Sequence, residues 1–343
     1  MKILVVGATG AIGKRLVPIL LADGHDVVGT SRSPQRAEEL RALGAEPVVL
    51  DLLDESAVRR VVGTTVPDAI VHEATALSGL SNNPRRFDED FALTNRLRTD
   101  GTDHLLAAAL ETGVRRVVAQ SFAGWPHARE GAPVKTEDAP LDPSPPKSAR
   151  RTHAAIRHLE AAVTGAAGIE GIALRYGGFY GPGTSLTRDG ELAQAIRKRR
   201  FPIVGSGRGV WSFVHVDDAA SATAAALTRG EPGIYNVVDD DPAPVSEWLP
   251  YLAQLLGARP PRRVPTWVGR ILAGELGVAM MTSVRGASNA KAKRELAWQP
   301  RHPSWREGFA AALAEDAGSQ DDGAPRGSSS TYGSAAGTLS TTT

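Results

Sequence analysis

Residues 2–13 have the sequence Lys-Ile-Leu-Val-Val-Gly-Ala-Thr-Gly-Ala-Ile-Gly, an apolar run that leads directly into three glycines spaced three residues apart. The apolar run predicts a buried parallel strand, and Gly7 at its exit permits a sharp turn because glycine tolerates a positive φ. Glycine also lets backbone N–H groups approach phosphate oxygens, and a helix N-terminus favours their negative charge. Residues 2–13 therefore predict a turn that holds the pyrophosphate of a dinucleotide.

The residues after this turn have helical spacing. Ile12, Leu16 and Ile19 form an apolar stripe, and Gly24 can end the helix. Strand, turn and helix thus follow in the order that dinucleotide binding requires, although a purely structural glycine turn in another α/β protein remains the alternative. The residues expected to contact the cofactor here are Gly7, Thr9, Gly10, Ala11, Ile12 and Gly13.

The alternation of strand and helix recurs through the first half of the chain. Such alternation is typical of a parallel sheet with right-handed crossovers. We therefore predict an α/β fold, a doubly wound Rossmann-like parallel sheet followed by a smaller C-terminal α/β substrate domain. The later strands are predicted at 26–29, 47–50, 69–71, 117–119 and 172–174, and helices at 35–43, 95–111 and 152–163.

These patterns divide the chain into three predicted regions. Residues 1–175 form the dinucleotide-binding Rossmann domain, with later strand and helix contributions around 205–240. Residues 176–315 form the substrate-binding region. Residues 316–343 are rich in Gly, Ser, Thr and Ala, so we expect a disordered tail.

Composition restricts the class of partner. The 343 residues carry 39 basic and 38 acidic side chains, a net charge of +1, which gives no electrostatic surplus for nucleic acid or an anionic membrane. The absence of cysteine excludes thiolate chemistry, and we expect no metal site. No run approaches the roughly 20 apolar residues of a membrane span, and the start leaves no room for a signal peptide. A cytoplasmic protein that binds a small molecule is the expectation.

The end of the second predicted strand indicates which dinucleotide binds. An NAD-binding protein generally has an acid there for the ribose hydroxyls, whereas this chain has Ser31-Arg32-Ser33. Arg32, with the neighbouring hydroxyls and Arg36, suits a 2′-phosphate, which a guanidinium binds through two hydrogen bonds. We therefore predict NADP, with NAD possible. The alternative is that Arg32 is a solvated surface charge.

Two further segments are expected along the cofactor. Asp51 and Leu52 follow the third strand, where the carboxylate can approach the adenine amino group or cap the next helix. After the fourth strand, Ala74 and Thr75 offer small side chains where the middle of the cofactor passes. His72, inside the apolar strand, is expected to be a core residue with satisfied hydrogen bonds.

Taken together, the motifs resemble the extended short-chain dehydrogenase/reductase superfamily, and within it the NAD-dependent epimerase/dehydratase family. The resemblance implies a dinucleotide bound across the strand ends, a smaller substrate domain and frequently a homodimer. It also implies that Asn95 belongs to the cofactor site and that Tyr176 flanks the nicotinamide. The matching segments are the glycine turn, Asp51-Leu52, Asn95 with Gly101-Thr102, Leu174-Arg175-Tyr176, Tyr180-Gly181-Pro182, residues 213–218, Tyr235-Asn236-Val237 and residues 295–300.

The resemblance implies a proton relay of Ser or Thr, Tyr and Lys, and here it is incomplete. Ser121 occupies the Ser position and is the expected catalytic residue, orienting the substrate oxygen. Counting back from Glu160, the Tyr and Lys positions hold Thr152 and Ile156. Counting from Ser144-Pro145 instead, they hold Pro146 and Arg150, so neither register restores the pair. The candidates for a replacement acid are Lys147, Thr152, His153 and Tyr180.

The expected function is therefore an NADPH-dependent oxidoreductase that reduces a small carbonyl or oxidises a small alcohol. Hydride transfer itself needs only the cofactor and a positioned substrate. One alternative is a sugar-nucleotide epimerase or dehydratase that uses tightly bound NAD. The other is a non-catalytic protein that senses the dinucleotide.

Overall fold

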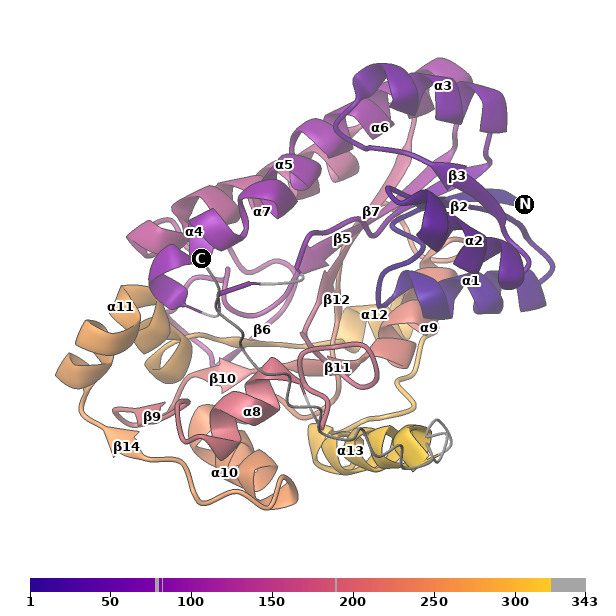
Figure 1. The fold of residues 1–343 in the computed structure, drawn as a ribbon. Coiled ribbons are helices and arrows are strands. Elements are labelled where there is room, and N and C mark those ends of the chain that lie inside the picture. Colours follow the sequence, from indigo (N-terminus) through magenta and orange to yellow (C-terminus); the bar gives the residue numbers. More distant parts are fainter. Residues whose placement is uncertain (78–79, 82, 189, 322–343) are drawn as a thin grey trace, which may run out of the picture.

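A computed structural model describes residues 1–321, apart from residues 78–79, 82 and 189. Its centre is a parallel sheet of seven strands in the order β12-β7-β5-β4-β1-β2-β3 (Figure 1). The strand order reverses beside β1, because β2 and β4 pair with its two edges, and ligands bind at such a switch point. The predicted α/β Rossmann-like fold is confirmed. The strands are β1 (Lys2–Val6), β2 (Asp26–Ser31), β3 (Glu46–Val49), β4 (Ala69–His72), β5 (Arg116–Phe122), β7 (Glu170–Tyr176) and β12 (Gly233–Val237).

Helices cover both faces of this sheet and enclose two apolar cores. The alternating side chains of each strand divide between them: Leu4 packs on one face, whereas Ile3 and Val5 pack on the other. One face carries α1 (Gly13–Ala22), α2 (Pro34–Ala42), α9 (Val216–Ala226) and α12 (Ala290–Glu295), and the other carries α3 (Glu55–Thr65), α5 (Ala92–Arg98), α6 (Asp100–Thr112) and α7 (Arg150–Gly165).

The segment predicted as one helix over residues 95–111 is two helices. Thr99 breaks it, with φ −97° and ψ −86° between α5 and α6. Its hydroxyl donates to the carbonyl of Asn95 at 3.1 Å and lies 3.2 Å from a carboxylate oxygen of Asp100. Threonine competes in this way for backbone groups, which explains a break without glycine or proline.

The second half of the chain builds a separate aromatic core below the sheet. Trp248, Trp305, Phe213 and Phe309 are buried there against one another. Helix α13 continues to Asp321, into the segment predicted as a tail, and residues 322–343 lie outside the described residues. The elements are β8 (Gly178–Tyr180), α8 (Glu191–Arg197), β9 (Ile203–Val204), β10 (Val210–Trp211), β11 (Phe213–His215), β13 (Ala243–Pro244), α10 (Val245–Leu255), β14 (Arg263–Val264), α11 (Thr266–Thr282) and α13 (Trp305–Asp321).

The segment between β5 and α7 is rich in proline and pairs with a strand from the second half of the chain. Its strand β6 (Val134–Lys135) pairs in parallel with β15 (Gly286–Ala287). Three short helices contact one another: η1 (Pro84–Arg86), α4 (Phe87–Asp90) and η2 (Lys147–Ala149). Among the described residues, no helix combines the length and apolar character needed to cross a bilayer.

Candidate functional site

The glycine turn has the close backbone packing that its sequence predicts. Gly7 has φ +89°, and a Cβ there would lie 2.8 Å from the backbone nitrogen of Ala74. A Cβ on Gly13 would lie 2.5 Å from the carbonyl oxygen of Ala8, because α1 begins against the end of β1. Two of the three glycines are therefore required by the backbone, which brings the start of α1 close to the switch point.

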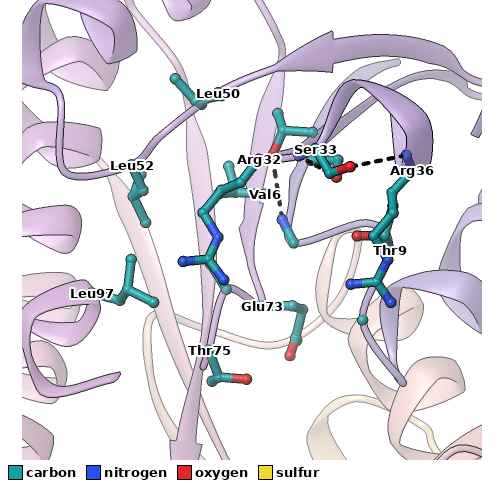
Figure 2. Close-up of a pocket in the computed structure, with 15 residues that line it drawn as sticks. Val6, Thr9, Arg32, Ser33, Arg36, Leu50, Leu52, Glu73, Thr75 and Leu97 are labelled. Carbon is teal, nitrogen blue, oxygen red and sulfur yellow. Dashed lines mark hydrogen bonds between the residues drawn. The ribbon is translucent and has the colours of Figure 1, made fainter. Parts of the chain in front are cut away.

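A pocket opens where the turn meets the ends of β2 and β4 (Figure 2). Its position matches the crevice in which doubly wound sheets bind nucleotides. Other predicted cofactor residues lie outside its lining: Ala11 and Ile12 near the start of α1, Gly13 in α1, Asp51 after β3, Asn95 in α5 and Tyr176 in β7. The predicted residues that line it are Gly7, Thr9, Gly10, Arg32, Leu52, Ala74 and Thr75.

The end of the pocket at β2 is basic. Arg32 and Arg36 both line it, both are exposed, and neither has an ion-pair partner among the described residues. Ser33 caps α2 by accepting from the backbone N–H of Arg36 at 3.4 Å, and Ser31 accepts from the N–H of Ser33 at 3.2 Å. Two guanidinium groups thus lie near a capped helix N-terminus, an arrangement that favours an anion.

The two predicted residues after β3 differ in position, because Leu52 lines the pocket and Asp51 does not. Leu52 lines the pocket, and Gly101 of α6 packs so closely that a Cβ there would lie 2.8 Å from it. Asp51 is exposed and accepts from the N–H of Leu53 at 3.0 Å. The alternative that Asp51 caps the next helix is wrong, because Asp54 caps α3 by accepting from the N–H of Ala57.

A buried acid in the pocket wall was missed by the sequence interpretation. Glu73 follows β4, is 6% exposed and lines the pocket beside the glycine turn. Its Oε1 accepts from the hydroxyl of Tyr176 at 2.8 Å, whereas Oε2 has no partner among the described residues. Burial raises the pKa of Glu73 to about 8. The sequence feature that could have indicated Glu73 as a site residue is its place directly after an apolar strand.

The neighbouring histidine is a core residue, as predicted. His72 is buried, and its Nε2 donates to the carbonyl of Leu97 at 3.2 Å. Burial lowers the pKa of His72 to about 4, so the ring is neutral at neutral pH.

In the register counted back from Glu160, the family's Tyr and Lys positions hold Thr152 and Ile156, and both residues make structural contacts. The Thr152 hydroxyl donates to Asp88 at 2.8 Å and accepts from the amide of Asn95 at 3.0 Å. Asp88 also accepts from the backbone N–H groups of Arg151 and Thr152, so it caps α7 from α4. Ile156 is buried in an apolar cluster. These contacts give α7 a fixed start without a phenol.

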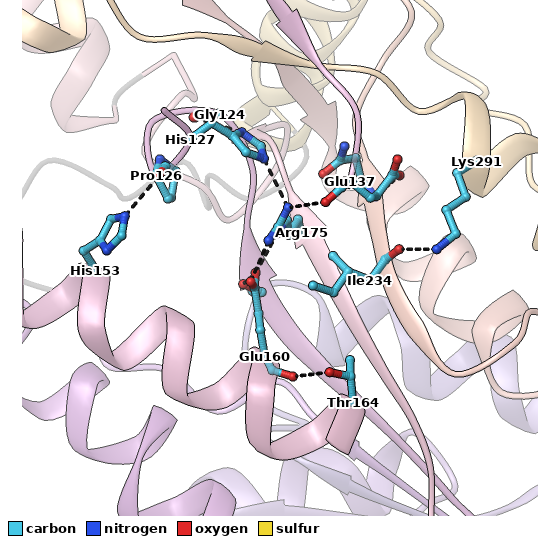
Figure 3. A network of polar contacts seen from close by, with 12 residues as sticks. Gly124, Pro126, His127, Glu137, His153, Glu160, Thr164, Arg175, Ile234 and Lys291 are labelled. Atoms are coloured by element: carbon cyan, nitrogen blue, oxygen red, sulfur yellow. Dashed lines mark hydrogen bonds and ion pairs between the residues drawn. The ribbon is translucent and has the colours of Figure 1, made fainter. Parts of the chain in front are cut away.

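Ser121 belongs to a buried network of polar groups on α7, β5 and β7. Figure 3 shows three other members of this network, His127, Glu160 and Arg175. Ser121 is 1% exposed, and its hydroxyl donates to Oε1 of Glu160 at 2.6 Å. Arg175 donates to both oxygens of Glu160, and a third Arg175 nitrogen lies 3.1 Å from Nε2 of His127. Since a guanidinium only donates, Nε2 of His127 accepts and Nδ1 donates to Gly124. The hydroxyl proton of Ser121 is thus directed at Glu160, and its role toward a substrate oxygen stays a prediction.

None of the four candidate acids lines the described pocket. Lys147 is exposed, and Thr152 is held by Asp88. His153 is buried with Nε2 donating to the carbonyl of Pro126 at 3.0 Å. Tyr180 is buried in the aromatic core against Phe309.

The residues around the pocket fit a dinucleotide. Gly7 and Gly10 line it without side chains, the β2 end is basic, and Glu73 has an oxygen with no partner among the described residues. Within the described ranges, no group of three His, Asp or Glu side chains is arranged to hold a metal ion.

Comparison with known proteins gives a family match over most of the chain. The model of the NAD dependent epimerase/dehydratase family matches residues 3–237. A 3-diazoavenalumate denitrifying reductase from Streptomyces sp is 44% identical over 312 residues, which cover 90% of this chain and 99% of that protein.

Two more distant matches agree with this. A 4-hydroxy-2-methyl-3-oxo-4-farnesyl-3,4-dihydroquinoline-1-oxide ketoreductase from Stigmatella aurantiaca is 28% identical, covering 76% of this chain and 74% of that protein. The crystal structure of UDP-glucose 4-epimerase from Thermus thermophilus in complex with NAD superimposes with a TM-score of 0.69 at 26% identity, covering 93% of this chain and 99% of the other.

Proposed function

Because the chain belongs to the NAD-dependent epimerase/dehydratase family, we propose that it is a reductase that prefers NADPH to NADH. The observation that carries the preference is the pair Arg32 and Arg36, which line the pocket at the end of β2 without an ion-pair partner among the described residues. A 2′-phosphate would give these guanidinium groups an anionic partner at the N-terminus of α2. Among the described residues at the end of β2, none is an acid that could bind the ribose hydroxyls of NAD.

We propose a diazo compound as the substrate. Support comes from the Streptomyces relative, whose name describes a diazo substrate and the removal of nitrogen, and from its 44% identity over 90% of this chain. A bound reduced nicotinamide supplies a hydride. In the diazonium form of such a substrate, a hydride delivered to the carbon would form a C–H bond while the C–N bond breaks and its electron pair leaves with dinitrogen.

This reaction removes the need for the missing relay. The product of hydride addition to a carbonyl is an alkoxide that must be protonated, whereas hydride addition to a diazonium carbon with loss of dinitrogen leaves a C–H bond and no anion to protonate. Thr152 and Ile156 at the Tyr and Lys positions are therefore compatible with diazo reduction. What the chain must do is position the substrate and exclude water.

Carbonyl reduction is the second candidate, favoured by the ketoreductase relative. In that reaction Ser121 would orient the substrate oxygen, as expected from the sequence, and a separate acid would protonate it. Sugar-nucleotide epimerisation has less support, because oxidation of an alcohol needs a base and neither Thr152 nor Ile156 can act as one.

The test uses NADPH deuterated at the hydride-donating carbon, with 4-carboxybenzenediazonium and 4-carboxybenzaldehyde as matched probes. We expect protein-dependent formation of benzoate carrying one deuterium, above a protein-free reaction that measures spontaneous reduction. Turnover of the aldehyde alone would replace diazo reduction by carbonyl reduction. Tight NADPH binding with no turnover of either probe would favour the non-catalytic alternative.

A further inference from the structure

Glu73 lines the pocket, and its carboxyl group has no compensating positive charge within ion-pair distance among the described residues. Tyr176 from β7 contacts it directly, Thr223 from α9 lies 2.7 Å from that phenol, and His72 on β4 is neutral. Arg32 and Arg36 line the same pocket, but Glu73 has no ion-pair partner among the described residues. A buried carboxylate in such surroundings is unstable relative to the neutral acid.

Glu73 lies directly beside the glycine turn, where the phosphates of the cofactor are expected. The predicted Cβ position of Gly7 lies 2.8 Å from the carbonyl carbon of Glu73, so the backbone of Glu73 touches the turn that would hold the pyrophosphate. An ionised Glu73 would place a carboxylate and phosphate anions in one poorly solvated pocket, where like charges repel strongly. A neutral acid avoids the repulsion and gains a donor, because Oε1 already accepts from Tyr176 and Oε2 is left to carry the proton.

We propose that Glu73 binds the dinucleotide as a neutral carboxylic acid, donating the Oε2 proton to an oxygen of the cofactor. The proposal rests on the proposed function, since it assigns a residue to the dinucleotide site. Glu73 is then a residue that positions the cofactor, and it does so only while its carboxyl group is protonated.

The proposal predicts that the affinity for the dinucleotide falls as pH rises. Burial raises the pKa of Glu73 to about 8, so the free protein carries the proton at neutral pH and loses it in alkaline solution. Nearby phosphate anions raise the pKa further in the complex, so binding takes up a proton above about pH 8. Affinity therefore falls by roughly tenfold per pH unit in that range.

The experiment is isothermal titration of NADH and NADPH between about pH 7 and pH 9.5 in two buffers of different ionisation enthalpy. Both reduced cofactors have an uncharged nicotinamide, and NADH also lacks the 2′-phosphate. In the NADH complex the pyrophosphate is therefore the only cofactor charge that Glu73 faces. For wild type we expect weakening of roughly tenfold per pH unit at the alkaline end and uptake of about one proton. Glu73→Gln still donates but cannot titrate, so its affinity should stay flat and its proton uptake near zero.

Two further variants separate the proposal from a structural effect. Glu73→Leu removes the donor and should weaken binding at every pH. Glu137→Gln changes a carboxyl outside the pocket, whose pKa burial also raises, and should keep the wild-type profile. Identical pH profiles and proton uptake for wild type and Glu73→Gln would overturn the proposal while leaving dinucleotide binding intact. Absence of binding by either cofactor at all pH values would overturn the proposed function and this assignment with it.

Discussion

Arg175 on β7 holds both carboxylate oxygens of Glu160 on α7, through two hydrogen bonds of 2.6 Å each (Figure 3). Both side chains are buried, with 3% and 5% of their surface exposed. Two charges removed from water are tolerated only as a pair with further hydrogen bonds, and Ser121 and His127 provide these. The pair joins α7 to the sheet at the strands β5 and β7.

Glu160→Gln should therefore destabilise the fold strongly. The change leaves the buried guanidinium of Arg175 without a counter-charge, which costs about 3–5 kcal/mol of unfolding free energy. Urea denaturation at neutral pH measures the loss. Arg59→Met is the matched control, because Arg59 forms an exposed ion pair with Glu55 at 3.2 Å that contributes less than about 1 kcal/mol. Equal small losses for the two variants would contradict this account of the network.

Arg32→Ala should remove the preference for NADPH. Loss of a charge-assisted hydrogen bond to the 2′-phosphate weakens NADPH binding by roughly 10- to 100-fold, and NADH binding should change little. Fluorescence titration with both cofactors gives the ratio of dissociation constants. Arg41→Ala, in helix α2 but outside the pocket, should leave that ratio unchanged. An unchanged ratio in Arg32→Ala would make Arg32 a surface charge.

Gly13→Ala and Gly63→Ala should have opposite effects, although both lie in helices. The Cβ at residue 13 would meet the carbonyl oxygen of Ala8 at 2.5 Å, so α1 must shift and the cradle is lost. Gly63 in α3 has nothing within 4 Å of its Cβ position, and alanine there favours the helix by up to about 1 kcal/mol. Thermal unfolding and NADPH titration compare them. Undiminished binding by Gly13→Ala would show that the turn does not hold the cofactor.

Asp239→Asn should stabilise the protein increasingly as pH rises. Burial raises the pKa of Asp239 to about 8, so between about pH 5 and pH 8 the folded state keeps a proton that the unfolded state releases. The unfolding free energy of wild type falls with pH in this range, by up to about 1.4 kcal/mol per unit from this group. Asparagine cannot titrate and can still accept from the N–H of Asp241.

Urea denaturation across this pH range measures the difference between Asp239→Asn and wild type. Asp23→Asn, which changes an exposed carboxylate, should follow wild type at each pH. A constant difference for Asp239→Asn would show that Asp239 does not titrate in this range.

The periodicity of apolar residues was sufficient to predict the parallel sheet. Each predicted strand of the first half lies within or beside an observed one, because strands buried on both faces are continuous apolar runs. The break at Thr99 was not predictable, since it depends on one hydroxyl that bonds Asn95 and contacts Asp100 instead of continuing the helix.

The pocket divides into residues that local sequence can reveal and residues that it cannot. The glycine turn and Arg32 have local signals, because spacing and the end of a strand define their places. Glu73 has no motif, and its importance depends on Tyr176, which is 103 residues away in sequence. The network of Ser121 is likewise formed by residues that only the folded sheet brings together.

The position of β12 at the edge of the sheet determines when the neighbouring strand β7 can be paired during synthesis. Strand β7 is synthesised before its outer neighbour β12, which consists of residues Gly233–Val237. Until those residues appear, the nascent chain presents an open strand edge that other chains can pair with. The second half of the protein therefore covers the edge of β7, and a fragment that stops near residue 175 would leave that edge unpaired.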